Sequence, residues 1–223
     1  MIAESMKPFL QGSSVIRAMF EEGKKMAKVY GAENVYDFSV GNPGLNPPQE
    51  VFDAIDYINH EMDPHDVHSY PSNAGFESTR KVVADDLNER FGSSYEAKNI
   101  IMTVGAGSAI NILMKTIFDP GDKQIVFAPY FVEYANWASN YGAETIVVPA
   151  SPETEFQPSV EGLKAALCPE VKVVIINNPN NPTGTIYSEE TIKALCDVLK
   201  EAEKEYGHPI YIIADEPYRE LVY

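Results

Sequence analysis

Asp215 is the residue whose setting most directly indicates chemistry. It follows residues 210–214, an apolar run that predicts a buried strand. A carboxylate in that position is costly unless a cation or several donors meet it. Three partners are possible, namely a structural arginine, a magnesium ion or a ligand cation. A protonated ring nitrogen would suit the position, because at an effective dielectric near 20 and about 4 Å the attraction is of order 4 kcal/mol.

A second polar group follows the preceding apolar run. Residues 177–184 read Asn-Asn-Pro-Asn-Asn-Pro-Thr-Gly, which predicts a turn with rigid amide side chains at the carboxyl end of a strand. Ser188 as N-cap and Gly207 as terminator predict a helix between this turn and the next strand. The resulting βαβ unit places Asn181 and Asp215 on the same edge of a sheet, where open α/β sheets bind ligands.

Small residues also mark the start of an earlier helix. Residues 103–109 read Thr-Val-Gly-Ala-Gly-Ser-Ala, and the N–H groups of Gly105, Ala106 and Gly107 are candidates for binding a phosphate at the helix N-terminus. A tight turn that needs small residues explains the motif equally well. The glycines do not complete a dinucleotide fingerprint, and the Gly-Lys-Ser or Gly-Lys-Thr of a P-loop is missing.

Aromatic and histidine residues supply two weaker signals. Tyr130 and Phe131 follow a strand, where aromatic rings either stack on a flat ligand or simply pack. His65 and His68 lie in the polar, proline-bounded segment 63–71, which predicts a surface loop. No third metal-ligating residue lies at a sequence spacing typical of metal sites. We therefore interpret the two histidines as solvated and predict no metal site.

The strand and helix signals alternate from Asn99 onward. Each apolar run is short and lacks polar alternation, as expected for strands covered on both faces. The fold class is therefore α/β, with a mainly parallel, doubly wound sheet and helices on both faces. The predicted strands are residues 100–103, 124–128, 144–148, 171–176 and 210–214.

The N-terminal part predicts helices and connecting loops. An amphipathic pattern predicts a packing helix, and a Gly- and Pro-rich loop follows a short strand. Val51, Phe52, Ile55 and Met62 are expected on the buried side of a helix that begins at Pro48. The predicted segments are the helix 13–30, the strand 35–40, the loop 41–48, the helix from 48 and a helix 75–91 closed by Gly92.

Composition narrows the class of protein. The 223 residues include 17 Lys and Arg against 33 Asp and Glu, a net charge of −16, which argues against a nucleic-acid or anionic-membrane partner. Cys168 and Cys196 are far apart and are predicted to be reduced thiols. Without a membrane-length apolar run or a signal-peptide pattern near the first residues, a cytoplasmic protein is expected.

Taken together, these motifs resemble the class I and II aminotransferases, the fold type I enzymes that use pyridoxal 5′-phosphate (PLP). The resemblance rests on Asn-Pro-Thr-Gly at 181–184, Asp-x-x-Tyr at 215–218, Gly-Ala-Gly at 105–107 and Pro-Tyr-Phe at 129–131, in the family's order. It implies that residues 1–46 belong to a small domain. Residues 47–223 would form the large PLP-binding domain, incomplete at its C-terminal end.

The resemblance also implies roles for individual residues. Asp215 would pair with the pyridinium nitrogen, and Asn181 and Tyr218 would bond the phenolic oxygen of the cofactor. Phe131 would stack on the ring, while Ala106 and Gly107, next to Gly105, would bind the phosphate. Gly41, with Asn181, would contact the substrate. Tyr70 would reach the phosphate in the neighbouring subunit, so a homodimer is implied.

The family's reaction moves an amino group between an amino acid and a 2-oxo acid. It needs a Schiff-base lysine, which in the family follows the Asp-x-x-Tyr strand and is absent from this chain. We therefore expect a fragment of a longer enzyme that is inactive alone. The alternatives are a PLP-dependent amino-acid lyase and a non-catalytic PLP-binding or relic protein. A nicotinamide oxidoreductase is more remote.

Overall fold

The structure is a computed structural model that describes residues 2, 4, 7, 15–38, 41 and 45–222. The chain divides into two compact units, Met1–Tyr70 and Pro71–Tyr223. The assignment of residues 1–46 to a small domain and 47–223 to a large one stays a prediction. Each unit is described by itself below.

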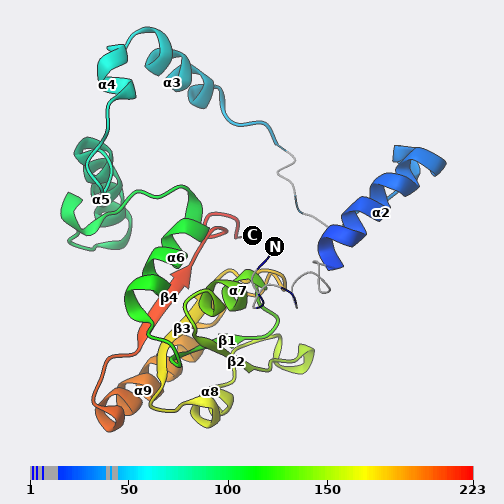
Figure 1. The fold of residues 1–223 in the computed structure, drawn as a ribbon, viewed down its shortest axis with the longest axis vertical. Helices are drawn as coiled ribbons and strands as arrows, with labels where there is room; N and C mark the ends of the chain where they lie inside the picture. Colours follow the sequence, from blue (N-terminus) through cyan, green and yellow to red (C-terminus); the bar gives the residue numbers. More distant parts are fainter. Residues whose placement is uncertain are drawn as a thin grey trace. The chain divides into compact units, whose positions relative to one another are not determined.

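The second unit is built on one four-stranded parallel sheet (Figure 1). The strand order is β2-β1-β3-β4, and β3 pairs with β4 in a register that aligns Asn177 with Asp215. The strands are β1 (Lys123–Phe127), β2 (Glu144–Val148), β3 (Val171–Asn177) and β4 (Tyr211–Asp215). The last four predicted strands are thus confirmed to within one residue at each end.

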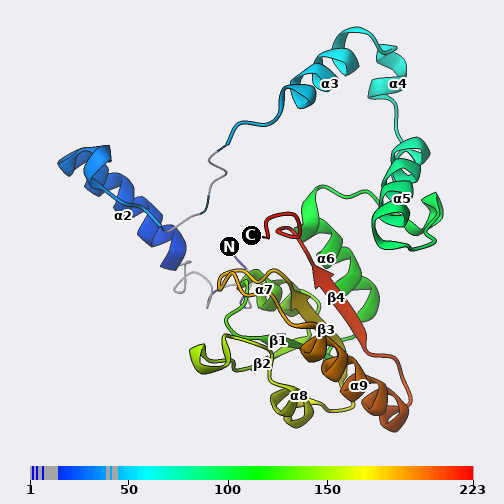
Figure 2. The same ribbon diagram turned by 180° about the vertical axis from the view of Figure 1, so that it is seen from behind.

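Helices cover both faces of this sheet (Figure 2). Successive strand residues face opposite sides of the sheet. Ile125 and Val174 therefore pack with α8 (Val160–Ala166) and α9 (Glu189–Tyr206), whereas Val126 and Val173 pack with α6 (Gly105–Ile117) and α7 (Glu133–Ser139). The doubly wound α/β architecture is therefore confirmed. The helices of this unit are α5 (Glu77–Phe91), η3 (Ala97–Asn99), α6 (Gly105–Ile117), α7 (Glu133–Ser139), η4 (Pro152–Thr154), α8 (Val160–Ala166) and α9 (Glu189–Tyr206).

The predicted βαβ unit forms around α9. The hydroxyl of Ser188 accepts a hydrogen bond from the Thr191 N–H at 3.0 Å, and Gly207 ends the helix in the left-handed conformation at φ 74°. Gly92 ends α5 in the same way, at φ 64°. Local capping signals therefore placed these helix ends correctly.

Two predicted strands are absent from the described residues. Residues 100–103 are irregular, and Ile101 is 63% exposed, because no described strand pairs with this segment. Residues 35–38 are likewise outside any strand, and residues 39 and 40 lie outside the described part of the chain. An apolar run becomes a strand only where a neighbouring strand takes up its backbone hydrogen bonds.

The first unit differs from the prediction in two places. Its helices are α2 (Val15–Tyr30), η2 (Ala32–Asn34), α3 (Gln49–His60) and α4 (Pro64–His68). The segment 63–71 is therefore not simply a loop, because the Asp63 carboxylate accepts from the His65 N–H at 2.7 Å and caps a short helix that contains both histidines. The expected buried side of α3 is open, with Val51, Phe52, Ile55 and Met62 between 40% and 50% exposed.

Candidate functional site

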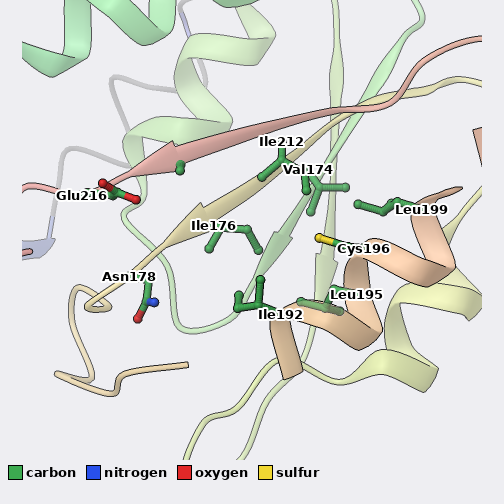
Figure 3. A pocket seen from close by; sticks show the side chains of 10 residues that line it. Val174, Ile176, Asn178, Ile192, Leu195, Cys196, Leu199, Ile212 and Glu216 are labelled. Carbon is green, nitrogen blue, oxygen red and sulfur yellow. The ribbon is translucent and has the colours of Figure 1, made fainter. Parts of the chain in front are cut away.

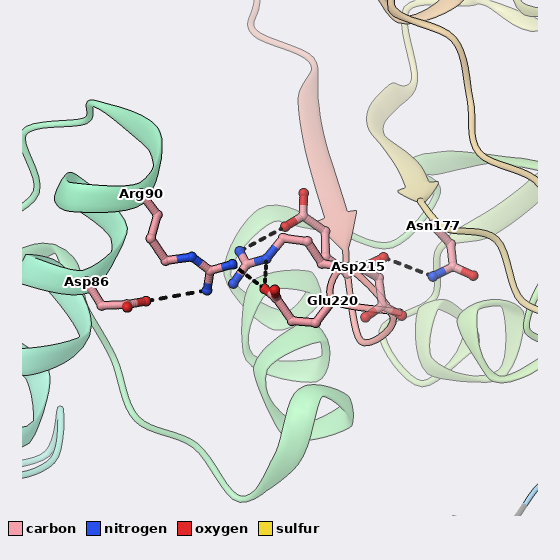
Figure 4. A network of polar contacts seen from close by, with 7 residues as sticks. Asp86, Arg90, Asn177, Asp215 and Glu220 are labelled. Atoms are coloured by element: carbon pink, nitrogen blue, oxygen red, sulfur yellow. Dashed lines mark hydrogen bonds and ion pairs between the residues drawn. The ribbon is translucent and has the colours of Figure 1, made fainter. Parts of the chain in front are cut away.

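Asp215 and the asparagine-rich turn are joined by one side chain. Asn177 ends β3 and is buried, and its Nδ2 donates to the Asp215 backbone carbonyl at 2.9 Å (Figure 4). Its Oδ1 accepts from the backbone N–H of Asn181 at 2.6 Å. The register of two neighbouring strands thus brings Asn181 and Asp215 to one edge of the sheet, as predicted.

Removing this bridge should destabilise the fold. Asn177→Ala removes two hydrogen bonds, the one that the Asn181 N–H donates to this side chain and the one that this side chain donates to the Asp215 carbonyl. The free energy of unfolding should therefore fall by about 2–3 kcal/mol. Urea denaturation measures the change. Asn140→Ala, at an exposed helix end, is the control and should stay within about 0.5 kcal/mol of wild type. Equal values for the two variants would contradict the bridging role.

The partner of Asp215 within the described residues is a phenol. The hydroxyl of Tyr134, on α7, donates to Asp215 Oδ2 at 2.5 Å. Burial, followed by the hydrogen bond to Asp215 and its charge, raises the pKa of Tyr134 far above that of an ordinary phenol. Tyr134 therefore stays a neutral donor at physiological pH. Among the described residues nothing donates to Oδ1 of Asp215, so one carboxylate oxygen can still meet a cation.

Tyr134 was missed from the sequence, although a signal existed. Phe131, Tyr134 and Trp137 are spaced by three residues and so share a helix face. Their rings pack edge to face, with centroids 5.6 Å apart for Phe131 and Tyr134 and 5.9 Å apart for Phe131 and Trp137. Phe131 packs, as one reading of the sequence allowed, and it remains 36% exposed. Its stacking on a ligand ring stays a prediction.

The start of α6 adjoins this aromatic group. A Cβ atom on Gly107 would lie 3.2 Å from the ring of Trp137, a tight contact, so the close packing of α6 against α7 favours a glycine there. Gly105 has φ 80° and, like Ala106, is exposed. Val104 at the N-cap provides no side-chain acceptor for the first-turn N–H groups. These groups can therefore donate to an anion.

The turn that carries Asn181 is fixed from within. Asn180 is buried, and its Oδ1 accepts from the Thr183 hydroxyl at 2.8 Å, while its Nδ2 donates to the Tyr187 phenol at 2.9 Å. Asn181 and Tyr218 line one open pocket of about 280 Å³. The structure therefore brings together two residues that the resemblance assigns to the same atom of the cofactor.

Because of Tyr187, the stability of this turn is expected to fall at high pH. Burial raises the pKa of Tyr187 to about 12, although the Asn180 hydrogen bond lowers it. Since an unfolded tyrosine titrates near 10, the stabilisation is complete below pH 10 and is lost as the pH rises to about 12. Chemical denaturation across this range should show a smaller loss of stability for Tyr187→Phe than for wild type. The exposed control Tyr36→Phe should keep the wild-type slope, and a Tyr187→Phe slope equal to it would refute this assignment.

The turn that carries Tyr218 is attached to α5 by charges (Figure 4). Arg90 on α5 binds the Glu220 carboxylate at 2.6 Å, and Arg219 binds the same oxygen at 3.1 Å. Asp86 lies 3.7 Å from Arg90. Because these side chains are partly exposed, the network contributes little stability, but it limits the positions open to residues 216–221.

Two predicted site residues belong to the first unit. Tyr70 belongs to the first unit and is fully exposed, and Gly41 is also exposed. Their proposed roles, toward a neighbouring subunit and toward the substrate, stay predictions.

A separate apolar groove lies between α9 and strands β3 and β4 (Figure 3). It has a volume of about 180 Å³ and is lined mainly by aliphatic side chains, with Cys196 pointing into it. Asn178 and Glu216 lie at the end nearest the carboxyl edge of the sheet. The chemistry of this groove differs from that of the polar edge, so we do not include it in the site.

The comparisons with known proteins decide the family. A family model described as aminotransferase class I and II matches residues 33–223. This chain belongs to that family. A crystal structure of an aminotransferase from Eubacterium rectale is 44% identical, with a TM-score of 0.95, and the match covers 100% of this chain and 56% of that one. The aspartate aminotransferase of Thermus thermophilus with maleate is 27% identical, with a TM-score of 0.81 over 100% and 55% of the two chains.

Curated relatives of this chain extend well beyond it. An aspartate aminotransferase from Pyrococcus horikoshii is 30% identical over 210 residues, which are 94% of this chain and 50% of the relative. A probable aspartate/prephenate aminotransferase from Thermus aquaticus is 37% identical over 154 residues, or 69% and 39% of the two chains. The chain thus spans half or less of the length of these relatives.

Three further properties concern other classes of site. No group of three His, Cys, Asp or Glu residues that could hold a metal ion occurs in the described ranges. Cys168 and Cys196 are both free thiols. None of the helices that the structure describes is long and apolar enough to cross a membrane.

Proposed function

We propose that this chain forms the cofactor-binding part of a PLP-dependent aminotransferase, which transfers an amino group between an amino acid and a 2-oxo acid. The proposal rests on one observation in a chain of the aminotransferase family: Asn177 holds Asn181 and Asp215 together at the carboxyl edge of the sheet. Both the geometry and the family support the same cofactor. A PLP-dependent lyase and a non-catalytic relic are the outcomes that the experiment below must exclude.

The donor set of the site fits PLP. The cofactor has a basic ring nitrogen, a phenolic oxygen and a phosphate, and the chain offers a carboxylate, an amide with a phenol, and a helix N-terminus. Asp215 keeps Oδ1 available while Tyr134 occupies Oδ2, as a carboxylate must if it is to meet a ring N–H. Asn181 and Tyr218 share a pocket, and the first turn of α6 has uncapped N–H groups.

Each residue would then perform one task. Asp215 would hold a proton on the ring nitrogen, Asn181 and Tyr218 would orient the ring through its oxygen, and Phe131 would cover one face. Gly105, Ala106 and Gly107 would bind the phosphate. When bound, PLP supplies an electron sink for the substrate carbon. The lysine that the family requires is proposed to lie outside residues 1–223.

Substrates, partners and location belong to the same proposal. The names of the relatives make aspartate the first amino donor to test. We infer a homodimer in which Tyr70 reaches the neighbouring site and Gly41 contacts the substrate. A cytoplasmic location fits this metabolic role.

Isotope transfer tests the proposed function. The longest product of the gene, loaded with PLP, is incubated with ¹⁵N-labelled amino acids, aspartate first, and a panel of 2-oxo acids. Label in the new amino acid supports an aminotransferase. Loss of ammonia, carbon dioxide or a side chain without need for an oxo acid would indicate a lyase instead. PLP binding without any turnover would indicate a non-catalytic protein.

A further inference from the structure

A buried amide lies behind Tyr134. Gln124, on β1, is completely buried, and its Nε2 donates to the Tyr134 backbone carbonyl and to the Thr145 hydroxyl, each at 2.8 Å. It faces the same side of the sheet as Val126, two residues on, which packs with α6 and α7. The side chain thus connects strands β1 and β2 to the helix that carries Tyr134.

Burying this amide in the core costs free energy. Its Oε1 is the buried side-chain oxygen without a hydrogen-bond partner in the described residues. An unsatisfied buried acceptor costs free energy that an aliphatic residue at the same place would not. Departures of this kind from core-packing rules concentrate at functional sites.

The contacts of Tyr134 show what the amide can control. Its ring plane is set by Phe131 and Trp137, and its hydroxyl reaches Asp215. The position of its backbone along the sheet is set by Gln124. Because a hydrogen bond weakens steeply beyond about 3.2 Å, a shift of α7 by roughly 1 Å would break the contact with Asp215.

We propose that Gln124 is a positioning residue of the cofactor site, which holds Tyr134 where its hydroxyl can fix the Asp215 carboxylate. The link runs from β2 through β1 and α7 to the end of β4. It fixes the orientation of the Asp215 carboxylate, and so the position of Oδ1, before any ligand binds. Its relevance to PLP rests on the proposed function, but the link itself does not.

The first test observes the hydrogen bond without the cofactor. In the longest product of the gene, the Tyr134 hydroxyl proton should give a slowly exchanging NMR signal, assigned by its loss in Tyr134→Phe. Gln124→Met keeps the side-chain length and removes the donors, so the signal should shift or broaden. Gln157→Met also removes amide bonds to backbone, at Ile186 and Ser188, and should leave the signal unchanged. An unchanged signal in Gln124→Met would overturn the proposal, even if its stability falls.

The second test measures coupling to PLP. Gln124→Met should raise the PLP dissociation constant roughly fivefold, the factor that one hydrogen bond of typical net strength is worth. In the Tyr134→Phe background it should add little, because the hydroxyl through which it acts is gone. If the double variant raised the PLP dissociation constant by the product of the two single-variant factors, the proposal would also be overturned. A responsive hydroxyl signal without any PLP binding would instead keep the link and refute the proposed function.

Discussion

Asp215→Asn is expected to slow amino-group transfer by about a thousandfold. The carboxylate and a pyridinium nitrogen about 4 Å apart attract by of order 4 kcal/mol at an effective dielectric of 20, and each 1.36 kcal/mol corresponds to a factor of ten. An amide keeps the size of the side chain and its bond to Tyr134 but cannot stabilise a positive charge. The rate should therefore fall with little change in fold.

Single-turnover kinetics in the PLP-loaded longest gene product measures this loss. Asp197→Asn, on the exposed face of α9, is the matched control and should keep the wild-type rate. Far-ultraviolet circular dichroism should show that both variants are folded. A decrease of less than about tenfold in Asp215→Asn would show that the carboxylate does not hold the ring proton.

Leu195→Ala is expected to cause the largest loss of stability. Leu195 on α9 is 2% exposed and lies in the core on the α8 and α9 side of the sheet. Truncating such a leucine costs about 2–5 kcal/mol, since transfer energy is lost and a cavity forms. Leu195 lines the apolar groove drawn in Figure 3, so its truncation would enlarge that groove. The midpoint of urea unfolding should shift strongly.

Leu113→Ala is the control for this change. Leu113 lies on α6 and is 43% exposed, so its truncation should cost well under half as much. A Leu195→Ala variant as stable as Leu113→Ala would mean that α9 is not packed as the structure shows.

The sheet could be predicted because its signals are local. Strands β1 to β4 are short β-branched runs, and the helix between β3 and β4 has its own caps at Ser188 and Gly207. Once β3 and β4 are parallel neighbours, Asn181 and Asp215 must share an edge. This part of the site follows from sequence and topology alone.

Other features depend on long-range contacts. Tyr134 meets Asp215 across 81 positions of sequence, and no periodicity encodes that pairing. Residues 100–103 have strand-like composition but no strand beside them in the described sheet. The hydrogen bond from Gln124 to the Tyr134 carbonyl could be predicted only if the position of α7 over β1 were known. Such contacts can be read only from the folded chain.

Borohydride trapping tests the central claim most directly. The longest product of the gene is mixed with PLP, reduced with sodium borohydride, and analysed by intact mass and peptide mapping. We predict one stoichiometric pyridoxyl adduct, on a single lysine outside residues 1–223. A protein with Asp215 and Asn181 intact that gives no specific adduct, or one scattered over surface lysines, would contradict the aminotransferase account.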